Sequence, residues 1–442
     1  EVRIGSLLLD GNEQLRGLQL AAQWRAGGLQ IDSLSLQRGD LALDLHGRLD
    51  PRGDWPLSAE GSLHLPAPGQ QPWQLAVQVS GDLLTGLQLI ADSTGYLNGR
   101  LTAEVQPLAD HLPARARLLA DGFKGGSELP DTLRLDKLEL NAQGDLAQGY
   151  RVNGSAELPG QGGPVALTLQ GLVDAGGAEV AVLELSASAE QRVHLSGQLD
   201  WREDFSLDSR FDWQDFPWRR LYPTAEEPPV LLRRLKGELA YQNGNYLGHF
   251  NADLEGPAGA FSLQSPLSGD LQQVHLPELQ LRAGQGQADG QLSLGFADAL
   301  SWDAQLQLSN FDPAYWLAEL PGQLGGPLRS QGQFKDQQLS LSADIDLKGR
   351  LRGQPAQFQA QGAGAGQQWT LSRLDLRLGD NRIQGSAALA QRLSGQLRLA
   401  LPRLGQLWPQ LQGQLDGQLD LAGTLQAPQG QLRLQGQRLA FA

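Results

Sequence analysis

Histidine and acidic side chains are the residues of this chain that could bind a metal or transfer protons. No two histidines have the spacing that zinc ligands show on one element. Five of the six alternate with apolar neighbours, which places them on the polar side of a strand. Asp44, Asp344 and Asp420 occupy the same kind of position. We therefore expect solvated side chains and no metal site, and the histidines are His46, His64, His111, His194, His249 and His275.

Two glycine-rich stretches, residues 284–290 and 362–366, have the composition of a nucleotide-binding loop. A dinucleotide loop joins a strand to a helix, whereas both stretches lie between runs that read as strands. We interpret them as hairpin turns. The chain has no Gly-x-Ser-x-Gly elbow and no phosphate loop, and it has no cysteine. We expect no enzyme and no cofactor.

Arginine pairs are a further place where ligand chemistry could occur. The pairs are Arg219 with Arg220 and Arg233 with Arg234, and they lie near Trp218 and Tyr222. They could touch a phosphate head group, although a solvated loop is the simpler interpretation. The whole chain has 49 acidic and 35 basic residues and a net charge of -14. Nucleic-acid binding needs a basic footprint, so we expect no nucleic acid as a partner.

Length and processing signals bound the class of protein. At 442 residues the chain is longer than one ordinary core, so it predicts several domains or a repeat array. No run approaches the roughly 18 apolar residues of a membrane-spanning helix. The chain has no methionine and no recognisable signal peptide, so we expect a segment excised from a larger protein.

Strict alternation of apolar and polar residues is the dominant pattern, and it predicts β-strands, because successive strand residues point to opposite faces. Between residues 339 and 351, apolar or small residues alternate with Ser, Asp, Lys and Arg. Short Gly/Asn/Asp turns separate such runs and predict antiparallel neighbours. The same alternation recurs at Leu41, Leu43, Leu45, Gly47 and Leu49, at Val193, Leu195, Gly197 and Leu199, and at Leu415, Gly417, Leu419 and Leu421.

A second pattern has two alternating apolar positions, a step of three, and two more. A β-bulge absorbs such a step while keeping one face apolar. The pattern starts at residues 29, 133, 180, 274 and 369, and the intervals are near multiples of about 47 residues, which indicates a repeat array. Its members are Leu29, Ile31, Leu34 and Leu36; Leu133, Leu135, Leu138 and Leu140; Val180, Val182, Leu185 and Ala187; Val274, Leu276, Leu279 and Leu281; and Trp369, Leu371, Leu374 and Leu376.

Proline-bounded segments interrupt the alternation and could each hold a turn or two of helix. They lie at residues 216–223, 311–321 and 404–409, with a less clear one at 107–113. We expect one continuous repetitive structure over residues 1–442. Its sub-repeats would be residues 1–113, 114–223, 224–321, 322–409 and 410–442.

These patterns predict an all-β fold, an elongated antiparallel β-meander curled into a U-shaped, Leu-lined groove. At about 12 residues per strand and turn the chain would hold roughly 35 strands. An apolar face of that size must be covered, and acyl chains of a lipid could cover it. A self-packed structural array, an adhesin, or a chaperone that binds unfolded β-strands by edge pairing are the alternatives.

The expected lining of the groove is the set of apolar positions described above. It comprises Leu29, Ile31, Leu34, Leu36, Leu41, Leu43, Leu45, Leu133, Leu135, Leu138, Leu140, Val193, Leu195, Leu199, Val274, Leu276, Leu279, Leu281, Leu339, Leu341, Ile345, Leu347, Leu371, Leu374, Leu376, Leu415, Leu419 and Leu421.

The chain resembles the TamB family, within the AsmA-like group of repeating β-groove proteins. The likeness is best in residues 369–442, where runs of Leu and Gly lead into a Pro-stopped short helix and the pattern P-x-G-x-L-x-L-x-G. The segments LQLSNFDPAYWLAELPGQLGGPLRSQGQF and FSLDSRFDWQDFPWRRLYP are similar to its strand-then-Pro-loop units.

The resemblance implies a periplasmic segment of a protein anchored in the inner membrane of a Gram-negative bacterium. It also implies phospholipid transfer toward the outer membrane and an outer-membrane barrel partner, TamA-like, contacted through a region absent from residues 1–442. Only the groove lining can be carried over to residues of this chain.

Overall fold

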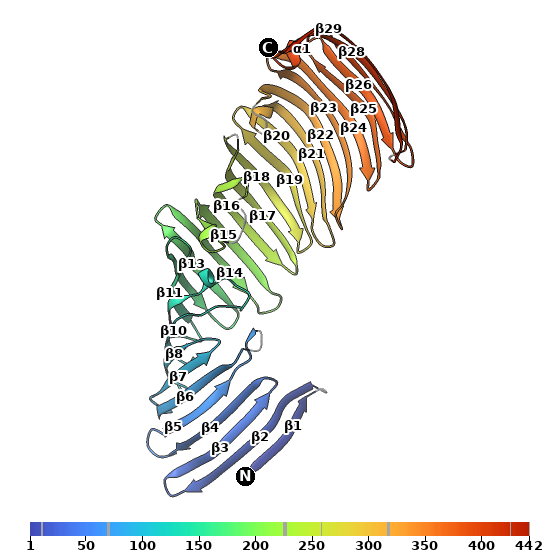
Figure 1. Cartoon of the computed structure of the whole chain (residues 1–442). Coiled ribbons are helices and arrows are strands. Elements are labelled where there is room, and N and C mark those ends of the chain that lie inside the picture. Colours follow the sequence, from blue (N-terminus) through green and yellow to red (C-terminus); the bar gives the residue numbers. More distant parts are fainter. Residues whose placement is uncertain are drawn as a thin grey trace. The chain divides into compact units, whose positions relative to one another are not determined.

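The computed structural model describes residues 1–9, 12–68, 71–223, 228–257, 259–315, 319–424 and 426–441. It divides into two compact units, residues 1–227 and residues 228–442. Each unit is built almost entirely from strands (Figure 1). Among the described residues, no helix is long and apolar enough to cross a membrane.

The first unit contains the strands β1 to β15 and two short 3-10 turns, η2 and η3. Their bounds are β1 Val2–Leu9, β2 Asn12–Arg25, β3 Gly28–Arg38, β4 Leu41–Leu49, β5 Pro56–His64, β6 Trp73–Asp82, β7 Gly86–Gly95, β8 Gly99–Val105, β9 Ala114–Ala120, η2 Asp131–Leu133, β10 Asp136–Asp145, β11 Gly149–Leu158, β12 Val165–Val173, β13 Gly177–Ser188, β14 Gln191–Asp200, β15 Ser206–Gln214 and η3 Trp218–Arg220.

The second unit contains the strands β16 to β29, the 3-10 turn η4 and a single turn of α-helix, α1. Their bounds are β16 Leu231–Gln242, β17 Asn245–Gly256, β18 Gly259–Asp270, β19 Gln273–Ala283, β20 Gly286–Gly295, β21 Leu300–Phe311, η4 Pro313–Tyr315, β22 Gly322–Lys335, β23 Gln338–Leu351, β24 Gln354–Ala365, β25 Gln368–Leu378, β26 Asn381–Leu389, β27 Leu393–Leu401, α1 Leu404–Leu407, β28 Leu411–Gly423 and β29 Pro428–Phe441.

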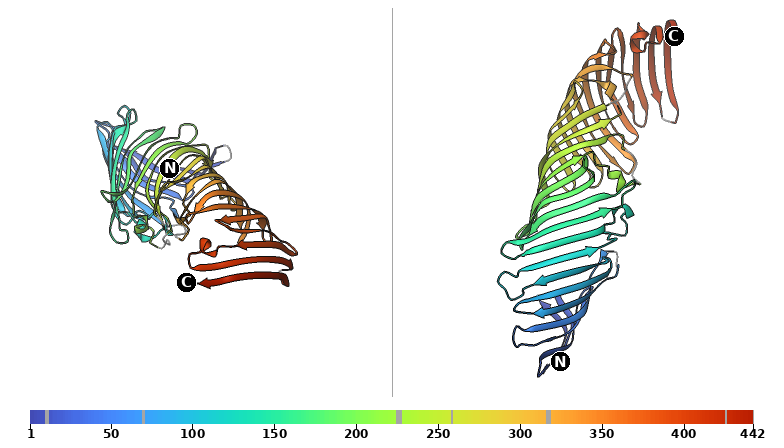
Figure 2. Two further views of the ribbon diagram at one scale, coloured as in Figure 1. Left: turned by 90° about the horizontal axis from the view of Figure 1, so that it is seen from above. Right: turned by 90° about the vertical axis from the view of Figure 1, so that its left-hand side faces the viewer.

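Within each unit every strand pairs antiparallel with the next one along the chain, as in β3 with β4 and β23 with β24. This is a meander, and the predicted all-β antiparallel fold is confirmed. The described residues form 29 strands rather than roughly 35, because many strands are long, up to the 14 residues of β23. In Figures 1 and 2, β22 to β28 are bowed ribbons lying side by side.

The helical turns follow β9, β15, β21 and β27, at intervals of six strands. Strand direction alternates, so the turns of one unit lie at the same edge of its sheet. The turns predicted within residues 216–223, 311–321 and 404–409 are confirmed, although residues 316–318 lie outside the described residues. The one predicted near residues 107–113 is wrong: that connection holds bends and turns, and the helical turn is η2.

Glycine on the apolar side allows neighbouring strands to approach more closely than other residues would permit. A Cβ placed on Gly197 would lie 2.3 Å from the carbonyl oxygen of Asp208 on the paired strand. At Gly385 the corresponding distance to the carbonyl oxygen of Gln396 is 2.4 Å. No side chain fits at such distances, so these glycines permit a local backbone geometry that other residues would forbid.

Candidate functional site: the apolar face

One face of each unit is apolar, because the register aligns the apolar positions of successive strands. A row of paired residues crosses β3 to β15 without a single polar side chain. At about 4.8 Å per strand this row is on the order of 60 Å long. Its members are Leu34, Leu45, Gly61, Val77, Ala91, Leu101, Leu118, Leu140, Gly154, Leu169, Leu183, Leu195 and Phe211.

The second unit has an equivalent row across β19 to β29. It too consists of apolar residues and glycine only. Its members are Leu279, Gly290, Leu306, Leu328, Ile345, Ala360, Leu374, Gly385, Leu397, Leu419 and Leu432.

The predicted bulges can be compared with the register of the sheet. The register shifts between Ile31 and Leu34, between Leu276 and Leu279, and between Leu371 and Leu374, each at the predicted step of three. In β13 the predicted step, from Val182 to Leu185, is wrong by two residues. The shift there falls between Val180 and Leu183, so Val182 pairs with Gln170 on the polar face.

The segment from residue 133 to residue 140 has its predicted bulge, since the register shifts between Asp136 and Glu139, but its first two apolar positions lie before the strand. Leu133 ends the turn η2, and Leu135 makes only an isolated bridge to Phe123. The strand begins at Asp136, and Lys137 has a positive φ of 51°. Leu133 and Leu135 nevertheless pack against a hydrophobic cluster of the apolar face.

Burial of the predicted lining residues is partial. Leu138, Leu276 and Leu279 are buried, and Leu339 is exposed. The other predicted lining residues are half-buried. Across residues 322–400, all of which the structure describes, no hydrophobic side chain is buried. The apolar face of β22 to β27 is therefore only partly covered by the protein itself.

The first unit contains a closed patch on the same face. Leu158, Val165, Phe216 and Leu221 form a buried cluster in which Val165 is 0% exposed. Phe216 and Leu221 flank η3. The connection formed by residues 216–221 therefore lies over the end of β11 and the start of β12. Partly buried side chains from β12 to β15 surround the cluster, and they are Leu167, Leu185, Ala187, Val193 and Trp213.

Hydrogen bonds hold that connection in place. The Thr132 hydroxyl donates to the carbonyl oxygen of Leu221 at 2.6 Å, and the main-chain N–H of Gln161 donates to the carbonyl oxygen of Arg220 at 2.7 Å. The ring of Phe216 meets that of Trp213 edge-on with centroids 5.4 Å apart. Arg219 and Arg220 are half-buried in this turn.

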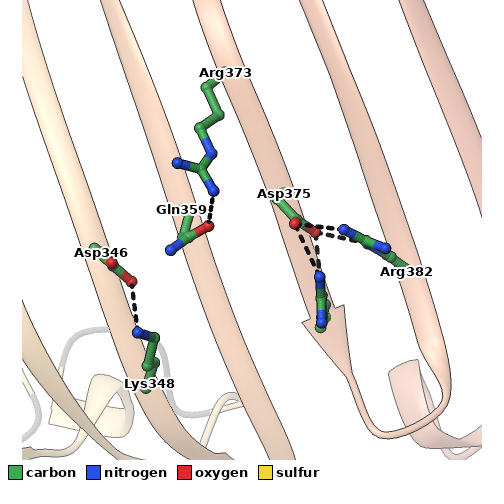
Figure 3. Close-up of polar contacts among 7 residues, drawn as sticks. Asp346, Lys348, Gln359, Arg373, Asp375 and Arg382 are labelled. Atoms are coloured by element: carbon green, nitrogen blue, oxygen red, sulfur yellow. Dashed lines mark hydrogen bonds and ion pairs between the residues drawn. The ribbon is translucent and has the colours of Figure 1, made fainter.

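The opposite face is polar and carries paired charges. Figure 3 shows Asp375 on β25 between two arginines. Arg382 donates to both carboxylate oxygens at 2.9 and 2.7 Å, and Arg377 lies 3.3 Å away. Asp375 is 6% exposed. Hydrogen bonding to Arg382, more than offsetting desolvation, holds the pKa of the Asp375 carboxyl at about 2.

The histidines considered for metal binding or proton transfer lie on different strands and connections. His194 is 3.7 Å from Glu184, and His275 is 2.7 Å from the Ser293 hydroxyl, each on the polar face. Among the described residues, no group of three or more potential ligands could hold a metal ion. The predicted hairpin turns occupy only one end of each glycine-rich stretch, at residues 284–285 and at Gly366. The remaining residues, 286–290 and 362–365, belong to β20 and β24.

Fold and face together define the class of protein: a repeating antiparallel β-meander in which each unit has an apolar face that its own side chains cover only in part. The family model described as "TamB, N-terminal domain" matches residues 2–255 and 222–442. The chain therefore belongs to the TamB family.

One curated relative is "Translocation and assembly module subunit TamB" of Haemophilus influenzae, which is 23% identical over 400 residues. The match covers 86% of this chain and 29% of the relative, so the chain spans less than a third of that protein. No solved structure matches the chain.

Proposed function

We propose that this chain conducts phospholipid acyl chains along its apolar face and makes or breaks no covalent bond. In this proposal it is a periplasmic segment of an inner-membrane-anchored protein that supports outer-membrane biogenesis. The observation that carries the proposal is the apolar face of residues 322–400, which the protein leaves half-exposed over six strands.

Free energy supports a lipid as the missing cover. Each methylene moved out of water contributes about 0.8 kcal/mol, so a 16-carbon chain contributes about 12 kcal/mol. A face of many similar Leu, Ile and Ala positions offers equivalent weak contacts at every strand. An acyl chain can therefore move along it without leaving one tight pocket, while its head group stays in water.

Photocrosslinking tests the proposal with an internal control. A photoreactive residue replacing Ile345 points to the apolar face, and one replacing its neighbour Asp344 points to the exposed polar face. With vesicles of phosphatidylethanolamine and phosphatidylglycerol, we expect lipid adducts at position 345 and at Leu419, and none at position 344. Equal labelling at both faces, or no lipid adduct at either apolar position, would contradict lipid conduction.

A second candidate function is a chaperone or scaffold in the assembly of outer-membrane β-barrel proteins. The printed name of the relative, a subunit of a translocation and assembly module, favours it. In the same experiment, adducts of position 345 with an unfolded barrel polypeptide and none with lipid would support this candidate. A structural array or adhesin would give no adducts of either kind.

A transfer assay separates an open face from a sealed core. Replacing Leu341 or Ile345 with arginine places a charge in the path of an acyl chain, and both positions are half-buried. We expect lipid transfer between vesicles to stop while the circular dichroism spectrum is unchanged. Normal transfer by both variants would contradict the proposal.

A further inference from the structure

A hollow on the polar side of the first unit lies over β7 to β12 and has a volume of about 720 Å³. That volume is within the range of about 300–1,000 Å³ that small-ligand sites occupy. Polar side chains in two parallel rows form its floor, and each row crosses five strands. One row contains Gln88, Glu104, Arg115, Gln143 and Arg151, and the other contains Ile90, Thr102, Arg117, Asn141 and Asn153.

Three arginines in one hollow are notable in a chain whose net charge is -14. Two of them are neutralised by the protein itself. Arg115 Nε donates to Glu104 at 2.7 Å, and Arg117 Nη2 lies 3.0 Å from Glu139. Among the described residues, Arg151 has no hydrogen-bond or ion-pair partner. Asp145 also lines the hollow, and its carboxylate accepts the main-chain N–H groups of Ala147 and Gln148 without an ion pair to any described arginine. Arg151 is therefore the arginine of the hollow that no carboxylate of the described residues contacts.

Side-chain amides surround that guanidinium. Gln143 is paired directly with Arg151 across β10 and β11, and Asn153 lies two residues further along the same face. Within the described part of the chain, the side chains of Gln143 and Asn153 also have no hydrogen-bond partner. An amide offers both donors and an acceptor, and a guanidinium fork matches a carboxylate. This group of three can bind a carboxylate flanked by hydroxyls.

The spacing of the rows favours a polymer over a single small anion. Equivalent positions recur at each strand, about 4.8 Å apart, which is comparable with the repeat of an extended sugar chain. A peptide would bring apolar side chains, for which the hollow offers only Ile90, Leu172 and the stems of the longer residues. We propose that this hollow binds an acidic oligosaccharide, with a carboxylate on Arg151 and sugar hydroxyls on Gln143, Asn153 and Asn141.

Calorimetric titration of the full chain with tetragalacturonate, at one fixed low salt concentration, tests this proposal. We expect saturable binding that Arg151→Gln weakens about tenfold, which corresponds to about 1.4 kcal/mol. Arg192→Gln is the matched control. Arg192 is an exposed arginine of the first unit on β14 and does not line the hollow, so this variant should bind as the unmodified chain does.

Three further measurements complete the test. Cellotetraose, a neutral sugar of the same length, should bind at least about tenfold more weakly. No binding of tetragalacturonate, or equal binding by Arg151→Gln, would overturn the proposal. Inorganic phosphate or a tetra-aspartate peptide binding as tightly as the sugar would show a general anion site and overturn the assignment to a sugar. Lipid crosslinking at Ile345 is unaffected by any of these outcomes.

Discussion

Two regions of this molecule use the same alternation of Leu with polar residues and end in opposite states of burial. Around β11 and β12, the connection that carries η3 folds over the apolar face, and Leu158, Val165 and Phe216 are 4%, 0% and 5% exposed. Across residues 322–400 of β22 to β27 no hydrophobic side chain is buried, and Phe334 and Leu339 are exposed. The alternation therefore makes a face apolar, and a long connection with large apolar side chains decides whether that face is closed.

The helical turns of the second unit show the difference. The turn η4 has no buried residue among those described, and α1 buries only Leu404. Their main contacts run along the edge of the sheet: Arg352 donates to the carbonyl oxygens of Glu319 and Leu407 and stacks on Trp408. These turns tie the edge together and leave the face of β22 to β27 accessible.

A charge placed in each region gives the largest expected difference. Val165→Arg buries an unpaired guanidinium and should destabilise the first unit by about 3–5 kcal/mol. Ile345→Arg should cost less than about 2 kcal/mol, because its long side chain can reach water from a half-buried site. Urea unfolding followed by circular dichroism measures both. Equal destabilisation would show that the two regions are equally closed.

Truncation of an aromatic ring gives the next largest effect. Phe216→Ala removes a ring from the closed cluster and should cost about 3–5 kcal/mol. Phe358 on β24 is half-buried, so Phe358→Ala should cost about 1–2 kcal/mol for its smaller apolar area. Denaturant midpoints of the two variants provide the comparison, and a larger loss for Phe358→Ala would reverse our assignment of the closed region.

Polar faces can be compared through their carboxylates. Asp375 is buried between two arginines, whereas Asp92, paired with Arg100, is exposed. The folded pKa of Asp375, about 2, lies below its ordinary value of 3.8. Its stabilising contribution is therefore present above pH 3.8 and is lost as the pH falls toward 2.

We expect Asp375→Asn to destabilise the second unit by about 1–2 kcal/mol at pH 7, reduced by solvent screening of the partly exposed arginines. The difference between this variant and the unmodified chain should shrink between pH 3.8 and pH 2. Asp92→Asn is the control and should change stability little at any pH. Unfolding midpoints measured at several pH values would contradict this expectation if the Asp375→Asn difference were independent of pH.

The smallest expected effect concerns the edge of the second unit. Arg352→Ala removes two hydrogen bonds to carbonyl oxygens and the contact with Trp408, for a loss of about 1 kcal/mol. Arg52→Ala in the first unit removes only an exposed pair with Asp50 and should change stability by less than about 0.5 kcal/mol. Tryptophan fluorescence should change in the Arg352 variant, because Arg352 stacks on Trp408, and should stay unchanged in the Arg52 variant.

Local patterns predicted the strands, their antiparallel pairing, the apolar face and four of the five bulges. Those features depend on neighbours within one or two strands. There the alternation with a period of two fixes which side chains share a face. The shift in β13 was misplaced because Val182 and Leu183 are adjacent apolar residues, so either could have taken the apolar side. The signal for the polar hollow was equally weak, because Arg151 alternates with apolar residues as any solvated arginine would.

By itself, the sequence determined that this protein is an antiparallel meander whose strands have one apolar side, because alternation acts residue by residue along each strand. Tertiary structure alone decided which stretch of that side is closed and where polar residues gather into a hollow. Those outcomes depend on contacts between distant segments, such as Thr132 with Leu221, and a local pattern carries no information about which distant segment will lie over it.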